Sequence, residues 1–417
     1  MNLRAAWQRL HGAKYRYVLV TTLVSLLAFA RNLLFMKTLD LAALGQIVIM
    51  QTLIMLVGFV QVGLINGAYI QYAARDRARN RQIVDVMSTA AMLLLPIAML
   101  ISLGMAATGF ASDLIRPATL AFGLTAGIAT LASTWLNNAL VADGLLVKSN
   151  LANLGAVLLS LTAAFLSRRY GLNAALASVL LQPLTVVVVA LIVDPNLRPS
   201  GFSLHSETLG SLFRLGAMPF LGGLAVLGMY QVERWTIAAV LGPEALGEFY
   251  IVLMYATFFT LIPAALLNFF FPQAKRAFAG ENGTELRILL RRHLIDLLSY
   301  FVLAVLCTLA LMQVAVDRFL PEFSQCARLV YVALPGLIIF GIRDTASLVL
   351  FASGKMQPLV SAGVLTLVLF SIFLAVLYGV NDLSLISVLA ARAVAMLPGT
   401  LILLVEKRRQ VAEMGNR

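Results

Sequence analysis

The segment "YQVERWTIAAVLGPEALGEFY", residues 230–250, places a glutamate beside an arginine inside an otherwise apolar run. A charged side chain at the centre of a membrane helix costs about 2.5 to 3.5 kcal/mol on the insertion scale, so such a pair is rare in lipid. The Leu-Gly-Pro that follows favours the end of a helix, because Gly242 tolerates a left-handed backbone and Pro243 has no backbone donor. The segment therefore predicts the end of one membrane span, a turn, and the start of the next.

The composition of the whole chain extends this reading. Of the 417 residues, 61% are hydrophobic and 12% are charged, whereas charged residues make up about 25% of a typical soluble domain. The apolar runs are long and do not alternate with polar residues, which indicates membrane-spanning helices and not the strands of a membrane barrel. The sequence therefore predicts an all-α polytopic membrane protein.

Short polar segments separate the apolar runs, and this pattern predicts twelve transmembrane helices in two six-helix bundles. The expected bundles are residues 1–195 and 211–417, joined by a cytosolic linker at residues 196–210. The expected spans are 15–36, 43–72, 83–108, 117–142, 150–167, 173–193, 211–241, 246–272, 296–315, 326–352, 358–379 and 383–405.

The basic residues predict how these spans are oriented. A cytosolic N-terminus puts the basic segments 75–81, 275–293 and 406–410 on one side, together with most of the 31 lysines and arginines. Because cytoplasmic loops of membrane proteins are enriched in Lys and Arg, both termini are predicted to be cytosolic. The net charge of +12 then reflects topology and does not call for a nucleic-acid partner.

The two halves of the chain resemble each other at a shift of 202 residues. At this shift Gly45 matches Gly247 and Asn66 matches Asn268. Both halves start from the same side of the membrane, so the repeat is parallel, with its axis along the membrane normal as in some transporters. Two such bundles are expected to leave a cleft between them, which is the default place for a substrate.

Four arginines fall inside predicted spans and must face protein or water, because four charges in lipid would cost about as much as a typical protein's total stability. Arg31 lies near the outer end of its span, where snorkelling to the interface is an alternative. Guanidinium groups suit phosphate because their planar fork donates two hydrogen bonds at once. Asparagines in the spans could bind sugar hydroxyls or hold helices together. The candidate ligands of an anionic glycan substrate are Arg31, Arg234, Arg343, Arg392, Asn66, Asn137 and Asn268.

Glu233 and Asp344 are the carboxylates placed well inside spans. Each is adjacent to an arginine, but neighbouring residues on a helix point about 100° apart, so their partners are expected on other helices. In a structural interpretation Glu233 pairs with an arginine across its bundle. In a functional interpretation the arginines outnumber the carboxylates and bind an anion, while Glu233 and Asp344 couple transport to a proton or sodium gradient or gate it.

Metal and enzyme chemistry find little support in the sequence. The histidines, His11, His205 and His293, stand in separate polar segments and form no cluster with carboxylates, so we expect no metal site. The longest predicted outer loop, residues 316–325, is too short to hold an active site. We therefore expect no catalytic residues, no cofactor and no enzymatic activity.

Residues 212–252 resemble the seventh span and following turn of the Wzx-type polysaccharide flippases of the multidrug/oligosaccharidyl-lipid/polysaccharide (MOP) exporter superfamily. The resemblance is carried by Pro219, by the Glu233–Arg234 pair, and by Leu241–Gly242 followed by Gly247. The pair in that family is usually Asp-Arg, so Glu233 departs from the pattern by one methylene group.

This resemblance implies a flippase that moves undecaprenyl-pyrophosphate-linked oligosaccharide from the cytosolic to the outer leaflet by alternating access. It implies a bacterial inner-membrane protein that serves O-antigen, lipopolysaccharide or exopolysaccharide synthesis beside polymerase and chain-length components. One alternative is a drug or cation exporter like the MATE transporters of the same superfamily, for which a net acidic cleft is expected. Another is a polymerase, ligase or scaffold of a polysaccharide assembly complex.

Overall fold

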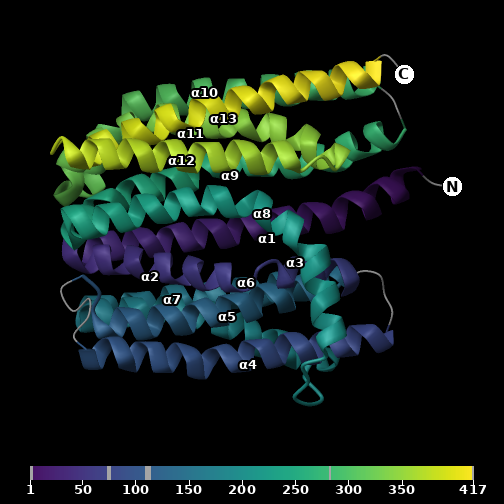
Figure 1. The fold of residues 1–417 in the computed structure, drawn as a ribbon, viewed down its shortest axis with the longest axis horizontal. Coiled ribbons are helices and arrows are strands. Elements are labelled where there is room, and N and C mark those ends of the chain that lie inside the picture. Colours follow the sequence, from purple (N-terminus) through teal and green to yellow (C-terminus); the bar gives the residue numbers. More distant parts are fainter. Residues whose placement is uncertain (1–2, 73–76, 109–113, 281–282, 416–417) are drawn as a thin grey trace. The chain divides into compact units, whose positions relative to one another are not determined.

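The computed structural model describes residues 3–72, 77–108, 114–280 and 283–415, and this part of the chain is helical with no strand (Figure 1). It divides into two compact units, Met1–Phe220 and Leu221–Arg417. The first unit contains α1 (Leu3–Thr38), α2 (Leu41–Val60), α3 (Leu64–Tyr72), α4 (Arg77–Thr108), α5 (Pro117–Ala142), α6 (Leu146–Phe165) and α7 (Ser167–Val193). The chain passes into the second unit within α8 (Ser206–Thr236). The second unit continues with α9 (Pro243–Ala279), α10 (Gly283–Phe319), α11 (Ala327–Ser353), α12 (Gln357–Gly379) and α13 (Leu385–Gly415).

Ten helices among the described residues are long and apolar enough to cross a membrane. The count becomes eleven if Ser206–Met218 and Gly223–Leu241, which pass the test together, form one broken span. These features are those of a multi-pass helical membrane protein. The first predicted span, 15–36, lies in α1, whose side chains before residue 20 are outside the described residues. The number twelve and the cytosolic position of both termini therefore stay predictions.

The predicted span 43–72 is wrong as a single helix. The structure breaks it into α2 and α3, because Val62 and Gly63 adopt positive φ angles of 42° and 86°. The side chain of Gln61 then accepts a hydrogen bond from the backbone nitrogen of Ile65 at 2.9 Å and caps the start of α3. The predicted turn at Gly242 and Pro243 is confirmed, since Gly242 has a φ of 93° and Pro243 is the first residue of α9.

The break before α3 allows a very close helix contact inside the first unit. A Cβ atom on Gly67 would overlap the carbonyl oxygen of Leu212, and one on Gly216 would overlap the carbonyl oxygen of Gly63. In Figure 1 the first residues of α8 pass beside α3 at this point. Glycines at this crossing let the two backbones touch, as small residues do between membrane helices.

The predicted linker 196–210 lies within the first unit, with the residues before α8 held against α4. The carboxylate of Asp85 accepts hydrogen bonds from the backbone nitrogen of Ser200 at 2.7 Å and from its hydroxyl at 2.5 Å. One helical turn further along α4, Thr89 accepts a hydrogen bond from the backbone nitrogen of Ser203 at 2.9 Å. These bonds fix the approach to α8.

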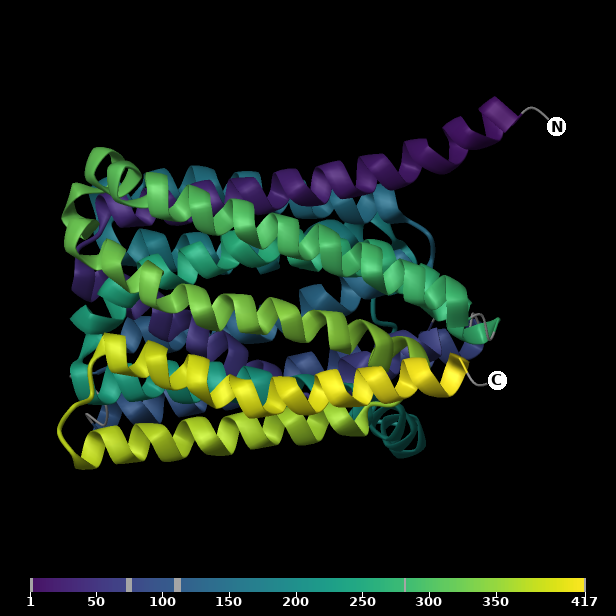
Figure 2. The same ribbon diagram turned by 90° about the horizontal axis from the view of Figure 1, so that it is seen from above.

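Helix α13 is central to the second unit, where it packs against both α11 and α12 (Figure 2). Small residues bring these helices together: a Cβ atom on Gly399 of α13 would lie 2.7 Å from the carbonyl oxygen of Ala362 on α12.

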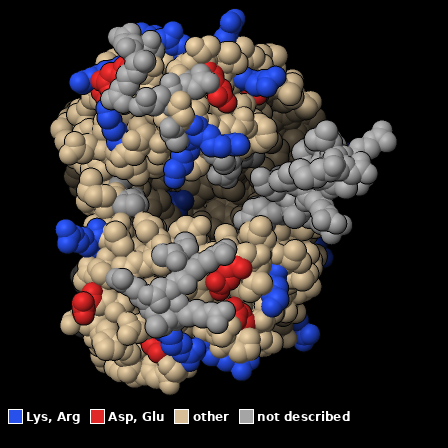
Figure 3. Space-filling model, turned by 90° about the vertical axis from the view of Figure 1, so that its right-hand side faces the viewer, with Lys and Arg blue, Asp and Glu red and all other residues tan. Residues whose placement is uncertain are grey.

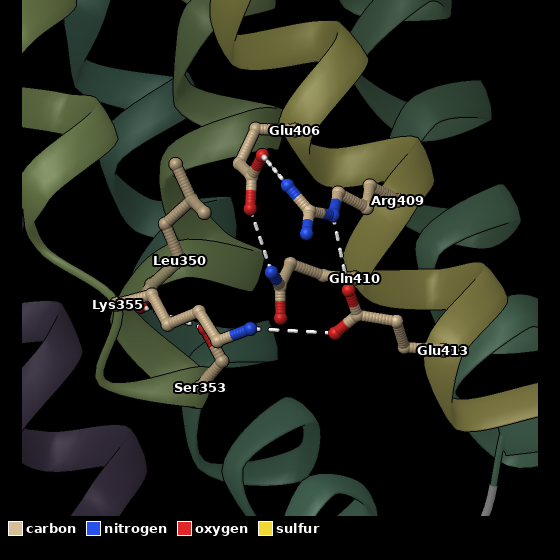
Figure 4. A network of polar contacts seen from close by, with 7 residues as sticks. All are labelled: Leu350, Ser353, Lys355, Glu406, Arg409, Gln410 and Glu413. Carbon is tan, nitrogen blue, oxygen red and sulfur yellow. Dashed lines mark hydrogen bonds and ion pairs between the residues drawn. The ribbon is translucent and has the colours of Figure 1, made fainter.

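Towards its end α13 is joined to the turn after α11 by a polar network (Figure 4). Lys355 and Arg409 both contact Glu413, at 3.3 and 3.1 Å, but these groups are exposed and such pairs contribute little. Lys and Arg side chains are common on the end of each unit seen in Figure 3.

We predict that Gly67→Ala destabilises the protein, because its new methyl group meets the backbone of Leu212 and not a movable side chain. Overpacking of this kind costs about 1–3 kcal/mol or more. The matched control is Gly155→Ala on α6, where nothing lies within 4 Å and alanine favours a helix by roughly 0.5–1 kcal/mol. The midpoint of thermal unfolding in detergent should fall for Gly67→Ala only; equal midpoints for the two variants would contradict the close contact.

Candidate functional sites

The second unit contains a buried ion pair between α8 and α13. Nη1 of Arg392 lies 3.0 Å from each carboxylate oxygen of Glu233, and the two residues are 4% and 0% exposed. The prediction that Glu233 finds its partner on another helix is confirmed. Within apolar helices this pair satisfies a charge that would otherwise be isolated, which is what the structural interpretation of Glu233 requires.

The backbone changes just after Glu233. Helix α8 ends at Thr236 and continues as a π-helical turn, Ile237–Leu241, closed by a hydrogen bond from the nitrogen of Gly242 to the carbonyl oxygen of Ile237 at 3.1 Å. A π-turn holds one residue more than an α-turn and is frequent at functional sites. Glu233 thus lies one helical turn before a turn that is not in the usual helical register.

Further arginines lie in the same unit. Arg343 on α11 is 5% exposed, and a Cβ atom on Gly363 of α12 would lie 3.5 Å from its Nη2. A Cβ atom on Gly336 of α11 would lie 3.7 Å from Nε of Arg392. Gly336 therefore marks the level of Arg392 on α11. Arg343 lies seven residues, or roughly 10 Å, further along the same helix. Each guanidinium group thus packs against the backbone of a neighbouring helix at a glycine.

Arg234 follows Glu233 on α8 and is half-buried. The side chains of two other predicted site residues, Asp344 and Asn268, lie outside the described residues. Among the described side chains of the second unit, the buried charged residues are Arg343, Arg392 and Glu233. This set carries one positive charge more than it has negative charges.

The first unit buries Arg31, which is 8% exposed. Its Nη1 donates to the hydroxyl of Ser160 on α6 at 2.7 Å and to Oε1 of Gln182 on α7 at 2.6 Å. Its guanidinium carbon lies 5.9 Å from the ring centre of Phe35. The alternative that Arg31 snorkels to the interface is therefore wrong, because its side chain is directed into the helix bundle.

Sequence reasoning missed the partners of Arg31. Ser160 donates in turn to the carbonyl oxygen of Ser178 at 2.7 Å, so the arginine is connected to the packing of α6 against α7. Single serines and glutamines in apolar runs are common between membrane helices. The available signal was Gln182, one of few amides in a run of apolar residues, and it is too weak to choose Arg31 as the partner.

The predicted asparagines are not brought together with the arginines by any described contact. Oδ1 of Asn137 accepts hydrogen bonds from Ser149 at 2.6 Å and from Asn153 at 2.9 Å, and so holds α5 to α6. Asn66 lies half-buried on α3. Among the described residues no three His, Cys, Asp or Glu side chains are grouped to hold a metal ion.

Comparisons with known proteins identify the fold. No protein-family model and no curated protein sequence matches the chain. Several solved structures do. An inward-facing multidrug resistance MATE family transporter of the MOP superfamily matches with a TM-score of 0.72 and 15% identity over 94% of this chain and 96% of that one. The lipid II flippase MurJ in an inward closed conformation also has a TM-score of 0.72, with 12% identity over 96% and 90%.

A third similar structure is a MOP superfamily transporter from Pyrococcus furiosus, described as having a binding pocket of reverse polarity that suggests a different function. It has a TM-score of 0.60 and 16% identity over 96% of this chain and 94% of that one. At these identities the likeness concerns the fold alone. The chain therefore has the fold of MOP superfamily transporters, and the resemblance seen in the sequence is confirmed at that level.

We predict strong coupling between Glu233 and Arg392. Alanine at either position leaves one charge buried without its partner, which typically costs about 3–5 kcal/mol, whereas the double variant leaves neither charge. The free energy of unfolding of the double variant should therefore fall by much less than the sum of the two single losses. Additive losses in chemical unfolding of the detergent-solubilised protein would contradict the ion pair.

Proposed function

We propose that this protein is a flippase that carries undecaprenyl-pyrophosphate-linked oligosaccharide from the cytosolic to the outer leaflet of the bacterial inner membrane. It would serve O-antigen, lipopolysaccharide or exopolysaccharide synthesis, with polymerase and chain-length components as partners. The two compact units would be the parts that move in alternating access. The observation that carries the proposal is the burial of Arg31, Arg343 and Arg392, each no more than 8% exposed, in apolar helices.

Arginine burial supports an anionic substrate on physical grounds. A buried guanidinium group is costly to keep in the membrane, so a protein that retains several must use them for packing or for binding. Pyrophosphate offers oxygens that match the guanidinium fork, and charge-assisted hydrogen bonds of this type are roughly twice as strong as neutral ones. The glycan would be bound by polar groups and the lipid tail would stay in the bilayer.

The fold comparison also favours a second candidate, a MATE-like exporter of drugs or cations. A cation exporter needs acidic groups accessible to its substrate. In the second unit Glu233 is fully buried and neutralised by Arg392, and Arg343 is a second buried arginine of that unit. Among the described side chains of the second unit two arginines and one carboxylate are buried, and this is the reason that we prefer the anionic substrate.

We predict that Arg31→Gln, Arg343→Gln and Arg392→Gln each slow the flipping of a fluorescent pyrophosphate-linked oligosaccharide lipid in proteoliposomes. A lost charge-assisted hydrogen bond should reduce transport roughly tenfold or more. Arg328→Gln is the matched control, because Arg328 lies exposed on α11, the helix that carries Arg343.

Equal flipping by all four variants, at equal protein content, would refute the assignment of these arginines to the substrate. Transport of a lipophilic cation by the wild type, with no flipping of the pyrophosphate lipid, would instead establish the exporter. Proton or sodium gradients imposed across the same liposomes test which ion, if any, drives the movement.

A further inference from the structure

The ion pair of the second unit uses only part of the arginine. Both hydrogen bonds to Glu233 come from Nη1 of Arg392, at 3.0 Å each. The other terminal nitrogen, Nη2, is buried and makes no hydrogen bond to any described residue. A carboxylate that met the guanidinium fork squarely would engage two nitrogens through two parallel bonds. The observed geometry leaves one donor of a buried cation for another acceptor.

The carboxylate of Glu233 presents to Arg392 the same chemistry that a phosphate group would present. Each offers two anionic oxygens to one guanidinium group. Because Glu233 is fully buried and Arg392 is 4% exposed, an external anion cannot reach Nη1 without replacing the carboxylate. Glu233 therefore occupies the position on Arg392 that the substrate's phosphate would need.

The turn after Glu233 provides a means of moving it. The π-turn Ile237–Leu241 begins one helical turn beyond Glu233 and ends at Gly242, whose φ of 93° few other residues would tolerate. If this turn releases its additional residue, the helix before it rotates by about 100°, the angle between successive residues. A rotation of that size would carry the carboxylate away from Arg392 without unfolding α8.

We propose that Glu233 is an internal competitor that holds Arg392 in the ligand-free protein and gives way to the phosphate of the substrate. This inference rests on the proposed function, since it assumes that the anion binds at Arg392. Its consequence is that Arg392 never lies buried without an anion, and that the return of Glu233 helps to expel the substrate. The apparent affinity for an anion is lowered by the fraction of protein in which the pair is closed.

The test measures binding of inorganic pyrophosphate to the purified full-length protein by isothermal titration calorimetry in detergent. Glu233→Gln removes the competing charge but keeps the size of the side chain. If the pair is closed in about nine-tenths of the molecules, this variant should bind pyrophosphate about tenfold more tightly than the wild type. Arg392→Gln should bind it more weakly. Glu244→Gln is the matched control, because Glu244 is an exposed carboxylate at the start of α9, and it should bind like the wild type.

The outcomes separate this inference from the proposed function. If Arg392→Gln weakens binding but Glu233→Gln binds no more tightly than the wild type, Glu233 is a structural partner and the competitor is refuted, while the anion site stands. If neither the wild type nor any variant binds pyrophosphate, the proposed function fails and the inference fails with it. Should Glu233→Gln not fold, Glu233→Asp replaces it: the shorter carboxylate reaches Arg392 less well, so a smaller gain in affinity is expected and the absence of any gain refutes the competitor.

Discussion

The whole arrangement depends on one constraint: a guanidinium group buried among apolar helices must find acceptors. Arginine does not give up its proton, so the group keeps its charge and its donors even when it is buried. Arg31, Arg343 and Arg392 are all buried, and neighbouring helices supply oxygens to Arg31 and Arg392. In the second unit Arg392 packs against Gly336 of α11 and Arg343 against Gly363 of α12.

The two units meet this constraint differently. In the first, Arg31 donates to neutral oxygens of Ser160 and Gln182, so its positive charge is solvated but not neutralised by these partners. In the second, Arg392 is neutralised by Glu233. Neutral acceptors leave the net charge of a guanidinium group unchanged, whereas a carboxylate cancels it. The described contacts of Arg31 and Arg392 thus differ in charge although the residue type is the same.

The sequence predicts those features that depend on local chemistry. A glycine followed by a proline favours the end of one helix and the start of the next through its own backbone chemistry. The turn at Gly242 and Pro243 was therefore predictable. The break at Val62 and Gly63 was not, because the close contact that it allows is with Gly216, which lies far along the chain. The helical geometry showed that Glu233 must pair with another helix, but no local pattern could select Arg392, which is 159 residues away. The partners of Arg31, Ser160 and Gln182, were missed for the same reason.

The most direct measurement is a cryo-electron microscopy structure of the protein with a bound pyrophosphate-linked lipid. Our account predicts density for the phosphate groups within hydrogen-bond distance of at least one of Arg31, Arg343 and Arg392. Phosphate density that lies only at exposed lysines and arginines at the helix ends, with all three buried side chains unchanged, would contradict it.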